Sequence, residues 1–247
     1  MNMYHPVAAA FLLLALGPGP ARATCTVLPS VPAVITQSGS YCLDRSYEVR
    51  LDSGDAIAIR SSHVTLDLAG HTVVNTADVF NQATGIGAQD RSNVTVRGGT
   101  LVGFGRGVAL GSSSGKCQHR TTGPYRVEDA TLIDSRFAAI DLQGCAMEVR
   151  RNRVFDTGIS LEYAAHGIIA DGTSVSVVDN DVQRVLANET YSVGIQVFAP
   201  RGVVERNRVQ SARNGLVLSS MVVYRDNTVV EFPGRSYQGG IDGGGNR

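Results

Sequence analysis

Two groups of polar residues near the middle of this chain carry side chains that could do chemistry. The first is a pair of carboxylates, Asp141 and Asp171, and the second combines His166 with Tyr163 and Arg136. Imidazole, phenol and carboxyl groups can exchange protons with a substrate, and a guanidinium can stabilise an anion. Because these residues are scattered along the sequence, they can act together only if the fold places their segments side by side.

Two short patterns repeat through the second half of the chain and indicate such a fold. One is built around asparagine, and its copies read MEVRRNRV, VSVVDNDV, GVVERNRV and VVYRDNTV. Each copy follows a short apolar segment, and these segments read AIDL, GIIA, GIQV and GLVL. The asparagines Asn152, Asn180, Asn207 and Asn227 are separated by 28, 27 and 20 residues. Self-similarity at this period is typical of a solenoid whose units differ in loop length.

Within each repeat the apolar residues alternate, as Val175 and Val177 do, which predicts short strands and not helices. Weaker copies of the pattern extend upstream to residues 63–74 and 93–104, and downstream to residues 239–243. We therefore predict an all-β fold, a parallel β-helix of about seven coils. The glycine-rich, aromatic-poor composition agrees with a chain of strands and turns.

The charge balance excludes one class of partner. The chain has 22 basic and 22 acidic residues, and Lys116 is its only lysine. Proteins that bind nucleic acid or anionic membranes nonspecifically carry a basic excess. We therefore expect no nucleic-acid partner, while arginines clustered on one face could still bind another polyanion.

The N-terminus has the pattern of a signal peptide. An apolar segment at residues 8–17 precedes Ala21-Arg22-Ala23, which is an A-x-A cleavage pattern. The segment is too short to span a bilayer. We expect a secreted or periplasmic protein without stable membrane insertion. It would consist of a signal peptide (residues 1–23), an N-terminal capping segment (24–53) and the β-helix (54–247).

The four cysteines are expected to form two disulfides. An even number of cysteines suits an oxidising compartment. Cys25 and Cys42 both lie in the capping segment, and Cys117 and Cys145 each follow a strand of the same type on successive coils. Stacking brings such positions within the Cα separation that a disulfide needs. We predict the pairs Cys25–Cys42 and Cys117–Cys145, and no metal site built on cysteine.

Two further rows of polar residues are interpreted as scaffold. Stacked asparagine amides can hydrogen-bond to one another and to buried backbone groups. The flanking charged residues alternate in sign from coil to coil and are expected to pair on the solvated surface. These residues are Asp129, Arg151, Asp179 and Arg206. Both rows are therefore left out of the predicted site.

Alternation also predicts which side chains leave the stack on the first strand of each coil. If Ile140, Ile168 and Ile195 point inward, the residues that follow them point outward. Two outward rows result, namely Asp141, Ile169 and Gln196, and then Gln143, Asp171 and Phe198. Long variable loops at residues 155–166, 182–193 and 229–239 enter these strands or their neighbours. Loops along one side of a regular stack form a groove that suits a linear polymer, so we expect a polysaccharide.

Asp141 and Asp171 would then lie on adjacent coils, with their Cα atoms roughly 8 Å apart by strand geometry. At that separation they could serve as acid and base in an inverting glycoside hydrolase. They could also hold a Ca²⁺ ion. A third alternative is that both are solvent-facing turn residues, because Asp171 precedes Gly172.

Several segments together resemble a known superfamily. A capping segment with LPS and ITQSGSYCL at residues 28–43 is followed by GDAIAI at 54–59 and VTLDLAGHTV at 64–73, and then by the repeats. This layout is similar to the right-handed parallel β-helix proteins of the pectate-lyase-like superfamily, and it covers most of the mature chain. The resemblance implies a right-handed helix whose active groove lies on the first strand of each coil. No enzyme family within the superfamily is indicated, since the NTD, DD, GHG and DPHD motifs are absent.

The resemblance also implies roles for the second group of polar residues. Uronate lyases and epimerases of this superfamily need a base, an acid and a cation, and His166, Tyr163 and Arg136 could fill these roles. Tyr191, Gln196, Phe198 and Gln143 would contact substrate. The alternative is that His166 only opens a strand and Tyr163 packs on the stack.

Three functions remain open. The first is a secreted lyase or epimerase that acts on an acidic, uronate-type polysaccharide. The second is a noncatalytic carbohydrate-binding or envelope structural protein, and the third is the inverting hydrolase with paired Asp141 and Asp171. The last coil, at residues 239–247, would expose strand edges unless its glycine-rich tail folds across it or a partner covers it, and a homo-oligomer is one such arrangement.

Overall fold

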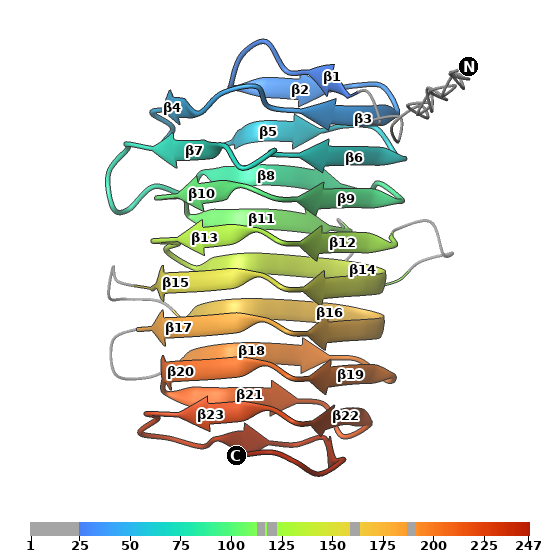
Figure 1. The fold of residues 1–247 in the computed structure, drawn as a ribbon, viewed down its shortest axis with the longest axis vertical. Coiled ribbons are helices and arrows are strands. Elements are labelled where there is room, and N and C mark those ends of the chain that lie inside the picture. The colour runs from blue at the N-terminus through green and yellow to red at the C-terminus, as the bar shows by residue number, and fades with distance from the viewer. Residues whose placement is uncertain (1–24, 113–116, 118–122, 159–163, 187–190) are drawn as a thin grey trace, which may run out of the picture.

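The structure is a computed structural model, and it describes residues 25–112, 117, 123–158, 164–186 and 191–247. These residues form 25 short β-strands, and no helix occurs among them. Figure 1 shows the strands stacked along one axis, with the N-terminal strands at one end and the C-terminal strands at the other. The predicted signal peptide lies outside the described residues.

The strands fall into three series that recur in the same order along the chain. The first series contains β2 (Ala33–Ile35), β5 (Asp55–Ile59), β8 (Thr84–Gln89), β11 (Arg106–Gly111), the first halves of β14 (Ala138–Arg150) and β16 (Ala165–Val178), β18 (Ser192–Phe198), β21 (Asn214–Leu218) and β24 (Tyr237–Gln238). The second contains β1 (Thr26–Val27), β3 (Gly39–Cys42), β6 (Val64–Asp67), β9 (Val94–Arg97), β12 (Tyr125–Glu128), the second halves of β14 and β16, β19 (Gly202–Glu205), β22 (Val222–Arg225) and β25 (Ile241–Asp242). The third contains β4 (Tyr47–Val49), β7 (Thr72–Asn75), β10 (Thr100–Val102), β13 (Thr131–Ile133), β15 (Arg153–Thr157), β17 (Asp181–Val185), β20 (Arg208–Ala212) and β23 (Thr228–Val230).

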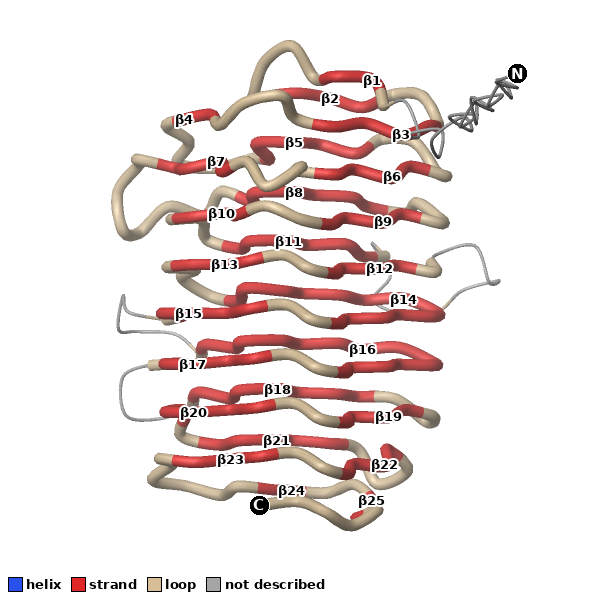
Figure 2. The backbone as a smooth tube through the Cα atoms, in the orientation of Figure 1, coloured by secondary structure: helices blue, strands red, loops and turns tan. Residues whose placement is uncertain are grey.

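Neighbouring strands within each series pair in parallel. Figure 2 shows the strands of each series lying side by side. Because β14 and β16 run through the first and second series without a break, these two series form one 17-stranded sheet, and the third forms an 8-stranded sheet. The strands of residues 25–53 join the same sheets through β2–β5, β3–β6 and β4–β7. The fold is therefore all-β with parallel strands, consistent with the predicted solenoid.

Apolar side chains fill the space that the sheets enclose. Ile140, Ile168 and Ile195 pair in register on β14, β16 and β18, and all three are fully buried. The inward direction predicted for them is confirmed. Parallel sheets occur in proteins only where such burial covers their apolar side, so these columns hold the strands together.

Three of the apolar repeats begin with glycine because a larger side chain would not fit at that position. A Cβ atom at Gly194 would lie 2.2 Å from Cγ1 of Val209 in the third series. The same position in the neighbouring repeats, Gly167 and Gly215, would place a Cβ 2.4 Å from a Cγ1 of Val182 and Val229. Real Cβ contacts are never this short, so the repeat needs glycine where the first and third series approach each other.

The asparagine row forms a continuous ladder of hydrogen bonds. Asn152 donates from its backbone N and from Nδ2 to Oδ1 of Asn180, both at 3.0 Å. The same two bonds link Asn180 to Asn207 and Asn207 to Asn227. Asn246 extends the ladder by one member, because its Oδ1 accepts from N and Nδ2 of Asn227 at 3.0 and 3.1 Å. The scaffold interpretation is confirmed, and Asn246 is a member that the sequence pattern did not identify.

The charged row beside the ladder consists of surface ion pairs, as predicted. Arg151 donates to Asp129 at 2.7 Å, and Arg206 donates to Asp179 at 2.7 Å. All four residues have a left-handed backbone, with φ between 53° and 58°. Arginine seldom adopts this conformation, so its presence here shows that the ladder turn dictates the backbone.

Both predicted disulfides are present, Cys25–Cys42 with Cα atoms 5.7 Å apart and Cys117–Cys145 with Cα atoms 4.6 Å apart. No cysteine among the described residues is free. Two disulfides indicate an oxidising, extracellular or periplasmic environment. The described residues also contain no helix that is long and apolar enough to cross a membrane.

Candidate functional site

The outward side chains of the first series form a surface that we call the first face. Its two central rows follow the predicted register. Asp141 pairs with Ile169 and Ile169 with Gln196, and one pleat further Gln143 pairs with Asp171 and Asp171 with Phe198. Asp141 and Asp171 therefore lie diagonally across neighbouring strands, as the alternation of β14 and β16 predicted.

His166 lies at the start of β16, opposite Ala138 of β14 and Val193 of β18. The ring of Tyr191 meets the imidazole edge-on, with centroids 6.0 Å apart. The histidine is thus partly enclosed by the first face and does not point freely into solvent.

The surroundings of His166 favour its neutral form. Burial lowers the pKa of the imidazole, while a hydrogen bond with the Gln196 side chain and the negative charge of Asp141 oppose that shift only in part. A neutral imidazole is the form that can remove a proton from a substrate. The lowered pKa keeps this form populated below the pH at which an exposed histidine would become charged.

Asp141 connects His166 to the second carboxylate. Burial raises the pKa of Asp171, and the charge of Asp141 raises it further. Asp141 itself is held by Arg106, whose Nε donates to Oδ2 at 3.2 Å, and Gln143 approaches its Oδ1 at 3.4 Å. From the sequence, the carboxylate pair and the His166 group were predicted as alternative sites. In the structure the charge of Asp141 acts on both Asp171 and His166.

A hollow of about 430 Å³ opens on the first face over β5, β8, β11 and β14. Its floor is made of small residues, Gly87, Ala109 and Gly111, and its rim carries Asp55 and Arg106. A Cβ at Gly87 would lie 2.5 Å from the Asp55 carboxylate, so that carboxylate lies directly over the glycine. The combination of a flat floor and a charged rim suits a polar ligand that lies along the stack.

Burial also raises the pKa of Asp55, against the hydrogen bond from Thr84 and the charge of Arg60. Asp141 is paired with Arg106, and Asp55 and Asp171 accept a proton more readily than exposed aspartates do.

The predicted substrate contacts differ in accessibility. Tyr191 and Phe198 are 40% and 41% exposed, so both offer aromatic surface to a ligand. Gln196 is only 6% exposed, and its Oε1 atom is buried without a hydrogen-bond partner that meets normal geometry in the described structure. That oxygen can accept a hydrogen bond from the imidazolium of His166 once it forms.

One of the predicted catalytic residues, Arg136, is engaged away from this group. Arg136 lies in the turn before β14, is 7% exposed and forms an ion pair with Asp134 of the same turn. Its charge is therefore already matched inside the turn, and Arg106 is the arginine that contacts Asp141. Tyr163 lies outside the described residues, which leaves Tyr191 as the described tyrosine beside His166.

Asp55 and Arg106 are functional candidates that the sequence did not identify. Each lies at the first position of a first-series strand, before the inward residues begin. The signal that could have found them is their register, because Asp55 pairs with Thr84 and Thr84 with Arg106, which continue the row that contains His166. The repeats are weakest in this part of the chain, so the alignment was not visible from sequence.

The carboxylates do not form a ready site for Ca²⁺. Among the described residues, no three histidine, cysteine, aspartate or glutamate side chains are grouped closely enough to hold a metal ion. Asp141 is also occupied by Arg106. Ca²⁺ needs six to eight oxygen ligands, so these residues do not fit a resident ion, and we assign no step to one.

Comparisons of this chain with protein-family models, curated proteins and solved structures gave no match. The resemblance to the pectate-lyase-like superfamily therefore rests on the segments quoted above. The parallel strands agree with that fold in its coarse form.

Proposed function

We propose that this protein is an exported enzyme of the pectate-lyase-like kind, with a right-handed parallel β-helix. On this proposal it acts on an acidic, uronate-type polysaccharide as a lyase or an epimerase. The observation that carries the proposal is His166, a partly buried imidazole with a lowered pKa beside Tyr191 and Gln196 on the first face. A titratable group whose pKa is shifted by burial and by polar neighbours is a candidate for a functional residue.

The chemistry starts with the proton on the sugar carbon that carries the carboxylate. His166 removes this proton, and the electron pair of the broken C–H bond moves into an enolate of the carboxylate group. In a lyase the electron pair then forms a carbon–carbon double bond, the bond to the glycosidic oxygen breaks, and that oxygen takes a proton. In an epimerase a proton returns to the same carbon from the opposite face. Tyr191, the described tyrosine beside the imidazole, is the candidate donor in both cases.

The neighbouring carboxyl groups support the enolate. Asp171, whose pKa is raised by burial and by Asp141, can donate a hydrogen bond to the substrate carboxylate when it is protonated. Gln196 accepts from the imidazolium and so stabilises the charge that His166 gains. Stabilising charge as it develops is the largest part of such catalysis.

One observation favours a second candidate, the inverting glycoside hydrolase. Asp141 and Asp171 are neighbouring carboxylates, and the pKa of Asp171 is raised partly by the charge of Asp141. Two carboxyl groups with separated pKa values are typical of an acid and a base in glycosidases. Because the raised pKa lets Asp171 hold a proton more readily, Asp171 would be the acid and Asp141 the base.

An assay of mature protein on a panel of uronate polysaccharides tests the proposal. The ultraviolet absorbance of the unsaturated product reports elimination, and a reducing-end assay reports hydrolysis. We expect absorbance that His166→Ala lowers by about 10²- to 10⁴-fold, the usual contribution of a general base. His71→Ala is the matched control, because His71 lies on the turn before β7, away from the first face.

Two other outcomes of these assays would support the alternative functions. Reducing ends without absorbance, lost in Asp171→Asn, would support the hydrolase. Polymer binding without any reaction, and with retained binding by His166→Ala, would support the noncatalytic alternative.

A further inference from the structure

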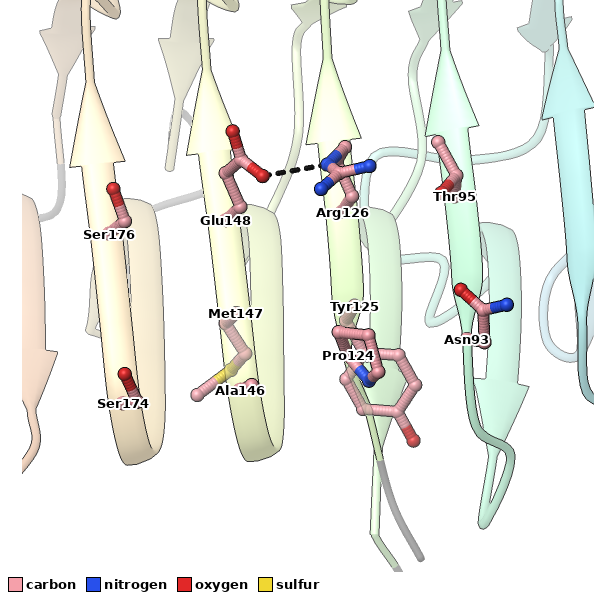
Figure 3. A pocket seen from close by; sticks show the side chains of 10 residues that line it. All are labelled: Asn93, Thr95, Pro124, Tyr125, Arg126, Ala146, Met147, Glu148, Ser174 and Ser176. Atoms are coloured by element: carbon pink, nitrogen blue, oxygen red, sulfur yellow. Dashed lines mark hydrogen bonds and ion pairs between the residues drawn. The ribbon is translucent and has the colours of Figure 1, made fainter. Parts of the chain in front are cut away.

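A second hollow lies on the opposite part of the 17-stranded sheet, on the outward surface of the second series, which we call the second face. It has a volume of about 390 Å³ and spans β9, β12, β14 and β16. Figure 3 shows its side chains on these four neighbouring strands. None of the residues that line it belongs to the His166 group. No step of the proposed reaction uses it.

The floor of the hollow is apolar and fixed in place. Pro124 and Ala146 lie at its centre, between Asn93 on one side and Ser174 on the other. Gly123 packs so closely on β14 that a Cβ there would lie 3.0 Å from the backbone oxygen of Ala146. The Cys117–Cys145 disulfide adds a covalent link at the residue next to Ala146.

The wall of the hollow carries polar side chains, and three of its hydroxyl groups form no hydrogen bond within the described structure. Thr95, Arg126, Glu148 and Ser176 follow one another in register across the four strands. No hydrogen bond within the described structure engages the hydroxyl groups of Thr95, Ser174 or Ser176. Hydroxyl groups that face a hollow and lack protein partners are available to a ligand.

Charge in this hollow is balanced. Nε of Arg126 donates to Oε2 of Glu148 at 2.7 Å, and Nη1 of Arg150 lies 3.3 Å from Oε1 of the same glutamate. Glu148 accepts a hydrogen bond only from Nε of Arg126. The Nη1 and Nη2 atoms of Arg126 therefore remain available to a ligand. A paired arginine and glutamate select neither an anion nor a cation, and together they present donors and acceptors.

We propose that this hollow binds a neutral oligosaccharide that lies along the stack. Sugar rings present C–H groups on their faces and hydroxyl groups on their edges, which match the apolar floor and the polar wall. Four strands at the usual spacing span about 15 Å, which is about three residues of an extended sugar chain. The site would hold a neutral glycan while the first face acts on an acidic one.

Titration calorimetry with β-1,4-linked tetrasaccharides of glucose, mannose and xylose tests the proposal on the full mature chain. We expect saturable binding to at least one of them. The double variant Ser174→Ala with Ser176→Ala should weaken it at least about tenfold, because two neutral hydrogen bonds are lost. Ala146→Trp, which fills the floor, should abolish binding.

Two controls separate this site from the first face. Thr228→Val removes a hydroxyl from the third series and should leave binding unchanged, as should His166→Ala. Absence of saturable binding to every neutral tetrasaccharide would overturn the proposal. So would binding that survives Ala146→Trp in a protein whose circular dichroism is unchanged, or binding that only His166→Ala removes.

Discussion

At the residue scale, Asp141 links the groups that we assign to chemistry. Its charge raises the pKa of Asp171 and opposes the lowering of the His166 pKa. Replacing it by asparagine should therefore lower both pKa values, since the imidazolium loses a favourable charge and the Asp171 carboxylate loses an unfavourable one. Nuclear magnetic resonance titration of the two side chains measures this directly. Asp156→Asn, which removes a carboxylate paired with Arg184 in the third series, should change neither value.

The pH dependence of activity follows from the same site. Burial lowers the pKa of His166, so its neutral form persists below the ordinary value of about 6.5. We expect the acidic limb of the kcat/KM profile to lie below that value. An acidic limb above it would show that His166 is not the base, because kcat/KM reports the pKa values of the free enzyme.

At the element scale, the asparagine ladder holds one turn against the next. Asn180 is 2% exposed and forms bonds to Val149, Val178 and Asn207. Asn180→Ala should lower the free energy of unfolding by about 2–3 kcal/mol, because buried backbone groups lose their partners. Asn246→Ala, at the more exposed end of the ladder, should cost less, and denaturant titration compares the two.

The close approach of the first and third series gives a second prediction at this scale. Gly194→Ala would press a methyl group against Val209 and should lower the free energy of unfolding by about 1–3 kcal/mol. Val209→Ala in the same chain should recover part of this loss by making space. Gly111→Ala is the matched control, since its Cβ would meet its nearest neighbour at 3.6 Å. Equal losses in both glycine variants would refute the packing argument.

Much of this architecture was predictable from sequence because it depends on local periodicity. Alternation predicted the inward isoleucines and the outward rows, stacking predicted the Cys117–Cys145 disulfide, and a shared place in the capping segment predicted Cys25–Cys42. Asp55 and Arg106 were missed because they precede the regular part of their strands, and Arg136 lies buried in a turn whose geometry no repeat encodes. Long-range register and turn geometry are the parts that a single sequence does not reveal.

At the scale of the whole molecule, the two disulfides close loops of 17 and 28 residues in sequence separation. Loops of this size predict a stabilisation of about 3 kcal/mol for each disulfide. We therefore expect a clearly lower Tm in a reducing agent, and a similar fall in each Cys→Ser pair variant. A Tm that does not change on complete reduction would argue against a protein built for an oxidising compartment.

We propose different roles for the two faces: the first carries out the reaction and the second binds a neutral glycan. The first face carries three carboxylates, Arg106 and His166, and the second face carries a charge-balanced hollow with free hydroxyl groups. Because the 17-stranded sheet contains both faces, a ligand on one is held in a fixed position relative to the other. Binding a neutral glycan would then keep the first face close to a mixed polysaccharide surface.

Proton exchange tests the central claim most directly, because every lyase or epimerase that uses His166 must first remove the proton beside the sugar carboxylate. A uronate oligosaccharide would be incubated with the mature protein in D₂O, and the hydrogen at that carbon would be followed by nuclear magnetic resonance. We predict that this hydrogen is lost, either by exchange for deuterium in an epimerase or by formation of the unsaturated product in a lyase, and that the loss disappears in His166→Ala and is retained in His71→Ala. A hydrogen that stays in place in all uronates tested, or that is lost at the full rate in His166→Ala, would contradict the account.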